Sequence, residues 1–285
     1  MSPDGAITTR HSVPTGDRDP GLRATREMAE TMLARAAERG LSVPAVGAGF
    51  PEYVDRSGLL TSREVLDWER QPAELLADLV PTVVIDSDVR CGAAAELHRP
   101  TAGFENFLYV SWGTGLSHTF VCDGRIHRGT RGEAIAIGEM RVASTEGVAV
   151  SQSLEQYCSG AGLARRYSEQ TGVVVPDGAR SVLSLASQGD TAATEILASA
   201  GHALGTALAQ AVALLDPEVI VLGGGLGTAE GLLHQALHQQ YAHDTSRRPG
   251  APPLTTSSFG ADAGLIGAGH LAWSVAQPQE DVDER

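Results

Sequence analysis

The chain has 285 residues, of which 42% are hydrophobic and 20% charged, and its formal net charge at pH 7 is -14. This length and composition predict a globular protein with one large domain or two lobes. The acidic balance disfavours nucleic acid as the main partner, because phosphate neutralisation needs clustered cations. No lysine occurs, which excludes a Schiff-base lysine and the lysine-bearing P-loop.

Cysteine usage and apolar runs indicate the compartment. Three cysteines, Cys91, Cys122 and Cys158, are too few and too scattered to predict a disulfide framework or a zinc knuckle. No apolar run approaches the length of a membrane span, and no signal-peptide pattern opens the sequence. We therefore expect a cytoplasmic protein with free thiols and no membrane partner.

The first hundred residues predict alternating helices and strands. Met28, Met32 and Ala36 recur at helical spacing, and Gly40 then supplies a helix stop. The expected elements are a returning hairpin strand at 6–10, helices at 22–39, 72–80 and 89–97, and strands at 43–49 and 82–85.

The rest of the chain predicts a second α/β group. A buried strand at 108–112 precedes a hairpin, for which Asp123-Gly124 between apolar runs is a strong signal. The long, alanine-rich segment 190–215 carries few charges and predicts a central buried helix. The remaining expected elements are short apolar segments at 135–137 and 147–150, helices at 153–170, 226–241 and 264–276, and strands at 218–222 and 254–257.

One carboxylate follows the strand at 82–85. Asp88 stands where this strand gives way to a helix, which in α/β sheets is the usual position for ligand-binding side chains. A structural alternative stays open, because aspartate also favours the N-cap position of a helix.

Two glycine-rich bends follow predicted buried strands, and these bends are candidate phosphate cradles. Backbone N–H groups at such a bend can hold an anion without a cationic side chain. For Gly113-Thr114-Gly115, a tight turn without a ligand is an equal alternative. The residues of the two bends are Gly113, Thr114, Gly115, Gly223, Gly224 and Gly225.

The segment 98–105 is the best candidate boundary between two lobes, at 1–104 and 105–285. The smaller first lobe would carry Asp88, and the larger second lobe would carry the two glycine bends. Backbone phosphate sites together with a separate carboxylate suit phosphoryl transfer.

At these residues the chain resembles the ROK family of repressors, open reading frames and kinases, within the actin-like ATPase superfamily of sugar kinases. The resemblance runs in order along about residues 5–275, so it predicts the two-lobed actin-like ATPase (ribonuclease H-like) α/β fold. Its pieces are 46–51, Val54-Asp55 with Gly58, Ser87-Asp88 with 93–96, Gly113 to Gly115, Asp123-Gly124, Gly129 with Gly132, Leu154-Glu155, 217–225 and 264–268.

The resemblance implies a role for each matching residue. Asp88 matches the family's catalytic base, which removes a proton from the attacking sugar hydroxyl. Gly113, Thr114 and Gly115 match its second phosphate motif. The glycines at 223–225 match those near adenosine. Glu155 matches a carboxylate that binds sugar hydroxyls, and Ser87 stands where the family usually has a sugar-binding asparagine.

The implied activity is an ATP- and Mg²⁺-dependent kinase of a sugar or a C7-cyclitol, with a homodimer as a reasonable assembly. Three departures qualify this expectation. The family's first phosphate loop, Asp-x-Gly-Gly-Thr, would precede residue 4, so the first lobe is expected to be truncated at its start. The zinc segment is replaced around Glu146 to Ser153, so no zinc is expected.

The third departure is in the sugar-binding Ala-Gly-Glu-Ile-Gly-His segment. In the gapless register its Glu becomes Ala136 and its His becomes Glu139, whereas in a shifted register the His falls on Val142. In both registers Glu139 is the sugar-facing carboxylate that remains. These departures leave open a second function, a catalytically degenerate protein that binds a sugar or nucleotide and regulates a partner.

Two other patterns have mainly structural readings. His234 and His238 are spaced for a helical metal site, but no acidic or cysteine partner is evident, so a solvated helix face is expected. Gly201 and Gly205 in the long helix predict close helix packing.

Overall fold

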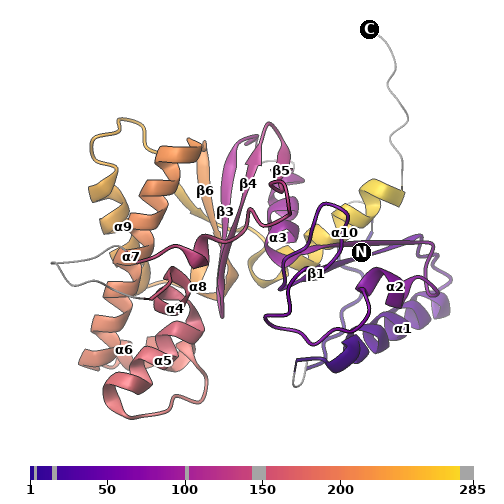
Figure 1. The fold of residues 1–285 in the computed structure, drawn as a ribbon, viewed down its shortest axis with the longest axis horizontal. Helices are drawn as coiled ribbons and strands as arrows, with labels where there is room; N and C mark the ends of the chain where they lie inside the picture. Colours follow the sequence, from indigo (N-terminus) through magenta and orange to yellow (C-terminus); the bar gives the residue numbers. More distant parts are fainter. Residues whose placement is uncertain (3–4, 15–17, 100–102, 143–151, 277–285) are drawn as a thin grey trace, which may run out of the picture. The chain divides into compact units, whose positions relative to one another are not determined.

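A computed structural model of the chain describes residues 1–2, 5–14, 18–99, 103–142 and 152–276 (Figure 1). It separates into two compact units. Unit 1 comprises Met1–Gly103, Ile126–Ile135 and Asp262–Arg285, and unit 2 comprises Phe104–Arg125 and Ala136–Ala261.

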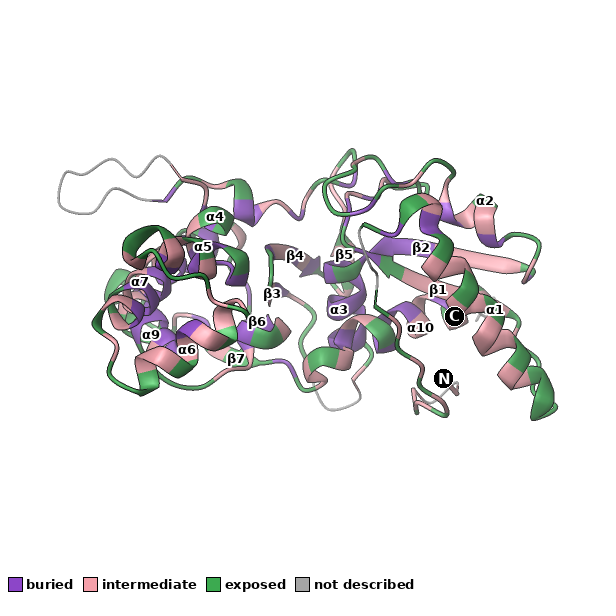
Figure 2. Cartoon of the chain, turned by 90° about the horizontal axis from the view of Figure 1, so that it is seen from below, coloured by how far each residue is buried: buried purple, intermediate pink, exposed green. Residues whose placement is uncertain are grey.

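Unit 1 is built on two parallel strands, β1 (Ala45–Phe50) and β2 (Thr82–Ser87). In their register Gly49 lies opposite Asp86, and Phe50 lies opposite Ser87. The first helix, α1, has no buried residue and appears mostly intermediate and exposed in Figure 2. The helical elements are η1 (Pro20–Leu22), α1 (Arg23–Glu38), α2 (Pro72–Leu76), α3 (Asp88–Leu97) and α10 (Ala263–Ala276).

Small residues bring α10 onto β1 and α3. A Cβ on Gly47 would clash with the Ala268 carbonyl, and a Cβ on Gly267 would clash with the Cys91 carbonyl. Backbone therefore approaches backbone closely at both crossings, which only glycine permits. This packing explains why the last helix of the chain belongs to the same unit as the first strand.

Unit 2 contains a five-stranded sheet in the order β5-β4-β3-β6-β7. The centre is buried because β3 and β6 are nearly continuous apolar runs, as expected of strands covered on both faces. β3 pairs antiparallel with β4 and parallel with β6. The strands are β3 (Phe107–Trp112), β4 (Leu116–Cys122), β5 (Arg125–His127), β6 (Val219–Gly223) and β7 (Leu254–Thr256).

The longest helix of unit 2, α7 (Thr191–Leu215), is a core helix. Within the described residues it alone has the length and hydropathy of a possible membrane span, and 56% of its most apolar window is buried in the protein. It packs on α9 (Leu232–Asp244) through Gly201 and Gly205, which confirms the predicted close packing. The other helical elements are η2 (Ile137–Glu139), α4 (Leu154–Cys158), α5 (Gly160–Thr171), α6 (Ala179–Ser187) and α8 (Gly224–Gly227). The 3-10 helix η3 (Gly260–Asp262) begins in unit 2 and ends in unit 1.

Several expected elements differ from the structure. The predicted strand at 6–10 is not a strand, and the described residues of the predicted helix at 153–170 form two helices separated at Ser159. Of the expected apolar segment 135–137, only Ile137 belongs to a regular element, the 3-10 helix η2. The expected segment 147–150 lies outside the described residues.

The division into units differs from the expected lobes at two segments. The first segment of unit 1 ends at Gly103, and Ile126–Ile135 and Asp262–Arg285 also belong to unit 1, whereas the expected lobes divide the chain once, after residue 104. Ile126–Ile135 is held there by Arg128, which pairs with Asp86, and by Arg90 of α3, which donates to the Gly132 carbonyl.

Candidate functional site

Asp88 is the first residue of α3, directly after β2. Ser87 occupies the N-cap position, so the alternative in which Asp88 caps the helix is wrong. One Asp88 carboxylate oxygen, Oδ1, accepts the Val89 N–H at 2.6 Å, and the side chain is open to solvent. Desolvation by the surrounding protein nevertheless raises the pKa of Asp88 to about 6, against the Val89 N–H and the Arg90 charge, which lower it. Asp88 can therefore exchange a proton near neutral pH.

Ser87 is buried, and its Oγ finds no hydrogen-bond partner among the described residues. A buried hydroxyl without a partner is costly, and this one lies at the end of β2 next to Asp88. Its predicted contact with a sugar stays a prediction.

Asp86, two residues earlier, is buried and paired. Its Oδ1 accepts Arg90 Nε at 2.5 Å, and its Oδ2 accepts Arg128 Nη2 at 2.5 Å. The fully buried Arg90 also donates to the carbonyls of Val54 and Gly132. The sequence reasoning missed this network, although Asp86 and Arg90 have the i, i+4 spacing of a helical ion pair.

In unit 2 the two predicted glycine bends lie side by side. Ser111 of β3 is opposite Gly223 of β6, so both strands end at the same edge of the sheet. A Cβ built on Gly113 would lie 3.7 Å from the Gly225 nitrogen. The carboxyl edge of parallel strands is where α/β proteins bind ligands.

Glycine is required at Gly224, where φ is +78° and a Cβ would lie 2.5 Å from the Trp112 carbonyl oxygen. Two hydrogen bonds from the start of α5 hold the neighbouring bend of Gly113 to Gly115. The Gly160 N–H donates to the Gly113 carbonyl at 2.7 Å, and the Ala161 N–H donates to the Thr114 carbonyl at 3.1 Å. Backbone at this edge is thus fixed before any ligand arrives.

The two predicted sugar-binding carboxylates of unit 2 lie on neighbouring elements. Glu155, exposed in the first turn of α4, accepts the Leu116 N–H through Oε2 at 2.8 Å. Glu139 is exposed at the end of η2, and a Cβ on Gly138 before it would lie 3.0 Å from Glu155 Cβ. Unit 2 therefore gathers Glu139, Glu155 and the glycine bends, whereas Ser87 and Asp88 belong to unit 1.

No set of three His, Cys, Asp or Glu side chains that could hold a metal ion occurs among the described residues. Mg²⁺ usually binds through few carboxylates together with substrate phosphates and water, so its use here stays a prediction. Most of the segment around Glu146 to Ser153, where no zinc is expected, lies outside the described residues. All three cysteines are free thiols, as predicted.

Two further features need separating from the site. His234 is buried, with Nε2 2.7 Å from the Leu226 carbonyl and its ring tilted against Trp112, so the predicted solvated helix face is wrong for this residue.

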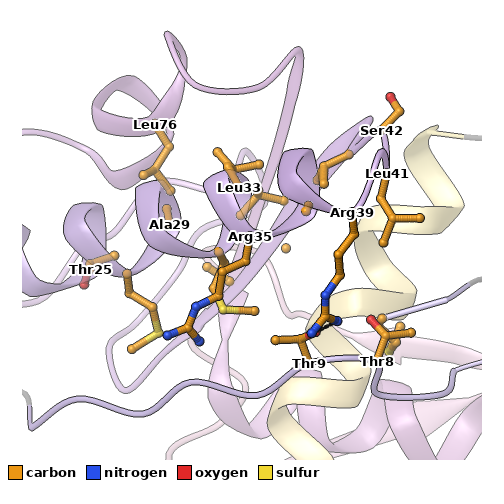
Figure 3. Close-up of a pocket in the computed structure, with 18 of the residues that line it drawn as sticks. Thr8, Thr9, Thr25, Ala29, Leu33, Arg35, Arg39, Leu41, Ser42 and Leu76 are labelled. Carbon is orange, nitrogen blue, oxygen red and sulfur yellow. Dashed lines mark hydrogen bonds between the residues drawn. The ribbon is translucent and has the colours of Figure 1, made fainter.

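A cavity of about 660 Å³ in unit 1 lies between α1, β1, α10 and the N-terminal segment (Figure 3). Its lining is mainly apolar, as at Met28, Met32 and Trp273, and none of the predicted site residues borders it.

Comparison with known proteins decides the family. The sequence model of the ROK family matches residues 1–275. The chain belongs to the ROK family. A ROK hexokinase from Thermus thermophilus has the same fold, with 29% identity, a TM-score of 0.77, and coverage of 92% of this chain and 89% of the hexokinase. The predicted family and the actin-like ATPase fold are thereby confirmed.

Curated ROK relatives include sugar kinases. The bifunctional enzyme NanE/NanK of Brucella melitensis is 34% identical over 196 residues, which make up 69% of this chain. The chain spans about a third of that enzyme, since the match covers 36% of its length. A glucokinase of Halalkalibacterium halodurans is 26% identical over 307 residues, covering 98% of this chain and 91% of the glucokinase.

Proposed function

We propose that this ROK protein is an ATP-dependent phosphotransferase that acts on a hydroxyl of a sugar, with a C7-cyclitol as the alternative acceptor. Asp88 would remove the proton of the attacking hydroxyl, and the backbone at Gly113 to Gly115 and at Gly223 to Gly225 would hold the nucleotide. Mg²⁺, bound together with the nucleotide, would neutralise charge on its phosphates. The kinase names of the curated relative and the solved structure support this class of reaction.

The observation that carries the proposal is the contrast between Asp86 and Asp88. Asp86 is buried and paired with two arginines, whereas Asp88 is open to solvent and has a pKa raised to about 6. A structural carboxylate needs the first environment, and a general base needs the second, because its pKa must lie near the operating pH.

Glu139 and Glu155 would bind acceptor hydroxyls. Both side chains are exposed and lie on the neighbouring elements η2 and α4. Two carboxylates that bind one acceptor need such a position, because both must be accessible and close to each other. Glu155 already holds the Leu116 N–H with one oxygen, so it would also connect acceptor binding to the Gly113–Gly115 bend.

The experiment is an acceptor screen. Purified protein is incubated with ATP, Mg²⁺ and single acceptors from a panel of glucose, other hexoses, N-acetylhexosamines and C7-cyclitols, and phosphorylated products are identified by mass spectrometry. A phosphorylated hexose or hexosamine supports the sugar kinase, and a phosphorylated cyclitol alone selects the alternative acceptor. No product from any acceptor contradicts the kinase.

A second function, sugar or nucleotide binding without turnover, is favoured by Ala136. In the gapless register this alanine stands where the family has a sugar-binding glutamate. Calorimetry separates the two functions, because a binding protein would bind an acceptor from the panel with no ATP hydrolysis or product. The homodimer and the cytoplasmic location remain predictions.

A further inference from the structure

The proposed reaction assigns no role to Arg90. Its side chain is fully buried on the first turn of α3, two residues after Asp88. A buried guanidinium is stable only where its N–H groups are all directed at acceptors, because an unpaired buried charge is costly. The acceptors that Arg90 bonds therefore show which segments its side chain holds together.

The guanidinium joins three separate parts of unit 1. Nε donates to Asp86 Oδ1 at 2.5 Å, Nη1 donates to the Gly132 carbonyl at 2.8 Å, and Nη2 donates to the Val54 carbonyl at 2.5 Å. The Val54 and Gly132 segments are themselves in close contact, since a Cβ on Gly132 would lie 2.7 Å from Asp55 Cα. The planar guanidinium of Arg90 thus fixes the end of β2, the loop after β1 and the segment that follows the hairpin.

A second arginine completes the network from its solvent side. Arg128 Nη2 lies 2.5 Å from Asp86 Oδ2, and its side chain is 30% exposed. Both oxygens of Asp86 are therefore occupied, and the backbone that leads into Asp88 cannot rotate without breaking one of these charged bonds. The Asp86 carboxylate also accepts the Ser87 N–H through Oδ1 at 2.8 Å.

We propose that Arg90 is a positioning residue for the phosphotransfer reaction. Through Asp86, Val54 and Gly132 it holds the β2–α3 junction in the one orientation that directs the Asp88 carboxylate at the acceptor hydroxyl. The proposal rests on the proposed role of Asp88 as the base. Lysine cannot replace Arg90, because a single ammonium group cannot span three acceptors in a planar fork.

The test compares Arg90→Lys and Arg90→Met with Arg26→Met, a control at an arginine that is part-exposed and lies outside the β2–α3 junction. Arg26 is also an arginine of unit 1 that bonds a carboxylate and a carbonyl, those of Asp78 and Leu75, but it lies on α1. The first readout is steady-state kinetics with the acceptor found in the screen. We expect kcat to fall about 10- to 100-fold in both Arg90 variants, the cost typical of a misplaced catalytic group, while the KM for ATP stays unchanged.

The second readout is the pH profile of kcat/KM. Arg90→Met removes a positive charge that lowers the pKa of Asp88. The fall of kcat/KM on the acid side of the profile should therefore move to higher pH in this variant. Arg90→Lys keeps the charge, so this acid limb should stay in place. The Arg26 control should change neither kcat nor the limb. A kcat within twofold of the wild type in both Arg90 variants overturns the proposal.

The third readout does not depend on activity. Amide hydrogen exchange should accelerate at residues 54–55, 87–89 and 130–132 in Arg90→Met, with α7 unchanged. The double variant Asp86→Asn, Arg90→Met removes both buried charges, so it keeps the test open if the single variant does not fold. Wild-type protein without any product would overturn the proposed function, and the exchange result would then decide alone whether Arg90 holds the junction. Unchanged exchange at 87–89 overturns the positioning role.

Discussion

Ser111 and Gly223 lie opposite each other in the parallel register of β3 and β6. This register ends both strands at the same edge of the sheet and puts the bend of Gly113 to Gly115 beside that of Gly223 to Gly225. Two peptide segments more than a hundred residues apart in the chain therefore meet at one place, where the proposed function expects backbone N–H groups to bind phosphate without lysine. The Gly113 N–H is not among these groups, because it donates to the Gly115 carbonyl at 3.0 Å.

Gly225→Ala separates ligand binding from stability at this edge. A Cβ on Gly225 meets nothing within 4 Å, and its φ is not positive, so we expect the melting temperature to stay within about 2 °C of the wild type. If a nucleotide approaches this backbone closely, the KM for ATP should rise about tenfold or more. An unchanged KM would remove Gly225 from the nucleotide site.

Gly224→Ala is the structural counterpart. Its φ of +78° and the nearby Trp112 carbonyl make any side chain strained, so we expect a loss of about 1–3 kcal/mol in the free energy of unfolding. Chemical denaturation measures this loss directly. Equal stability of the Gly224→Ala and Gly225→Ala variants would contradict the described backbone.

Asp88→Asn should not destabilise the protein. Because the pKa of Asp88 is raised from 3.8 to about 6 in the fold, the stability that its neutral form contributes is complete below pH 3.8 and is lost as the pH rises through 6. Asparagine stays neutral, so at pH 8 we expect an unfolding free energy equal to or above that of the wild type. The difference should shrink toward pH 4, and a less stable variant at pH 8 would argue that Asp88 is structural.

Glu52 gives the opposite pH dependence. Burial of its carboxylate raises its pKa, but bonds from the Ser62 hydroxyl and from the N–H groups of Leu66, Glu64 and Val65 outweigh this and lower the pKa below 4.5. Its stabilising effect is therefore present above pH 4.5 and is lost as the pH falls through the lowered value.

Glu52→Gln should cost about 2 kcal/mol at pH 7, as expected for losing bonds to a charged acceptor. Denaturant unfolding of both proteins at pH 7 and pH 3 measures the cost, which should decrease at the lower pH. A cost that grows toward pH 3 would contradict the assigned bonds.

The cavity of unit 1 predicts that packing there can be improved. Ala29 of α1 borders the cavity, so Ala29→Leu should fill part of it and raise the melting temperature. Gly47→Ala on the β1 wall should lower it, because its Cβ would clash with the Ala268 carbonyl. Thermal unfolding measures both, and a stabilising Gly47→Ala would contradict the packing of α10 on β1.

Local patterns in the sequence predicted most of the fold. The strands before Gly113 and Gly223 and the helix at 190–215 lie close to their expected bounds. These elements are buried, and a buried element can be recognised from the run of apolar residues in its own sequence. The short helix α6 was not predicted, although Val182, Leu183 and Leu185 give it apolar residues that pack on the core.

The positions of the candidate site residues were predicted only where they depend on neighbours in the chain. Asp88 and the glycine bends lie at strand ends, as the apolar runs before them predicted, and their roles in the site stay predictions. Arg128 reaches Asp86 across 42 residues, and this pairing depends on the return of Ile126–Ile135 to unit 1. Nothing in the spacing of the chain indicates such a return, and the register of Glu139 likewise depends on tertiary contacts.

The most direct measurement of the central claim is ADP release by the wild type and by Asp88→Asn at pH 7.5, with ATP, Mg²⁺ and the best acceptor. We predict that kcat falls about 10²- to 10⁴-fold in the variant, as for loss of a general base, while the KM for ATP stays unchanged. ADP release at equal rates in the two proteins, dependent on the acceptor, would contradict the role of Asp88.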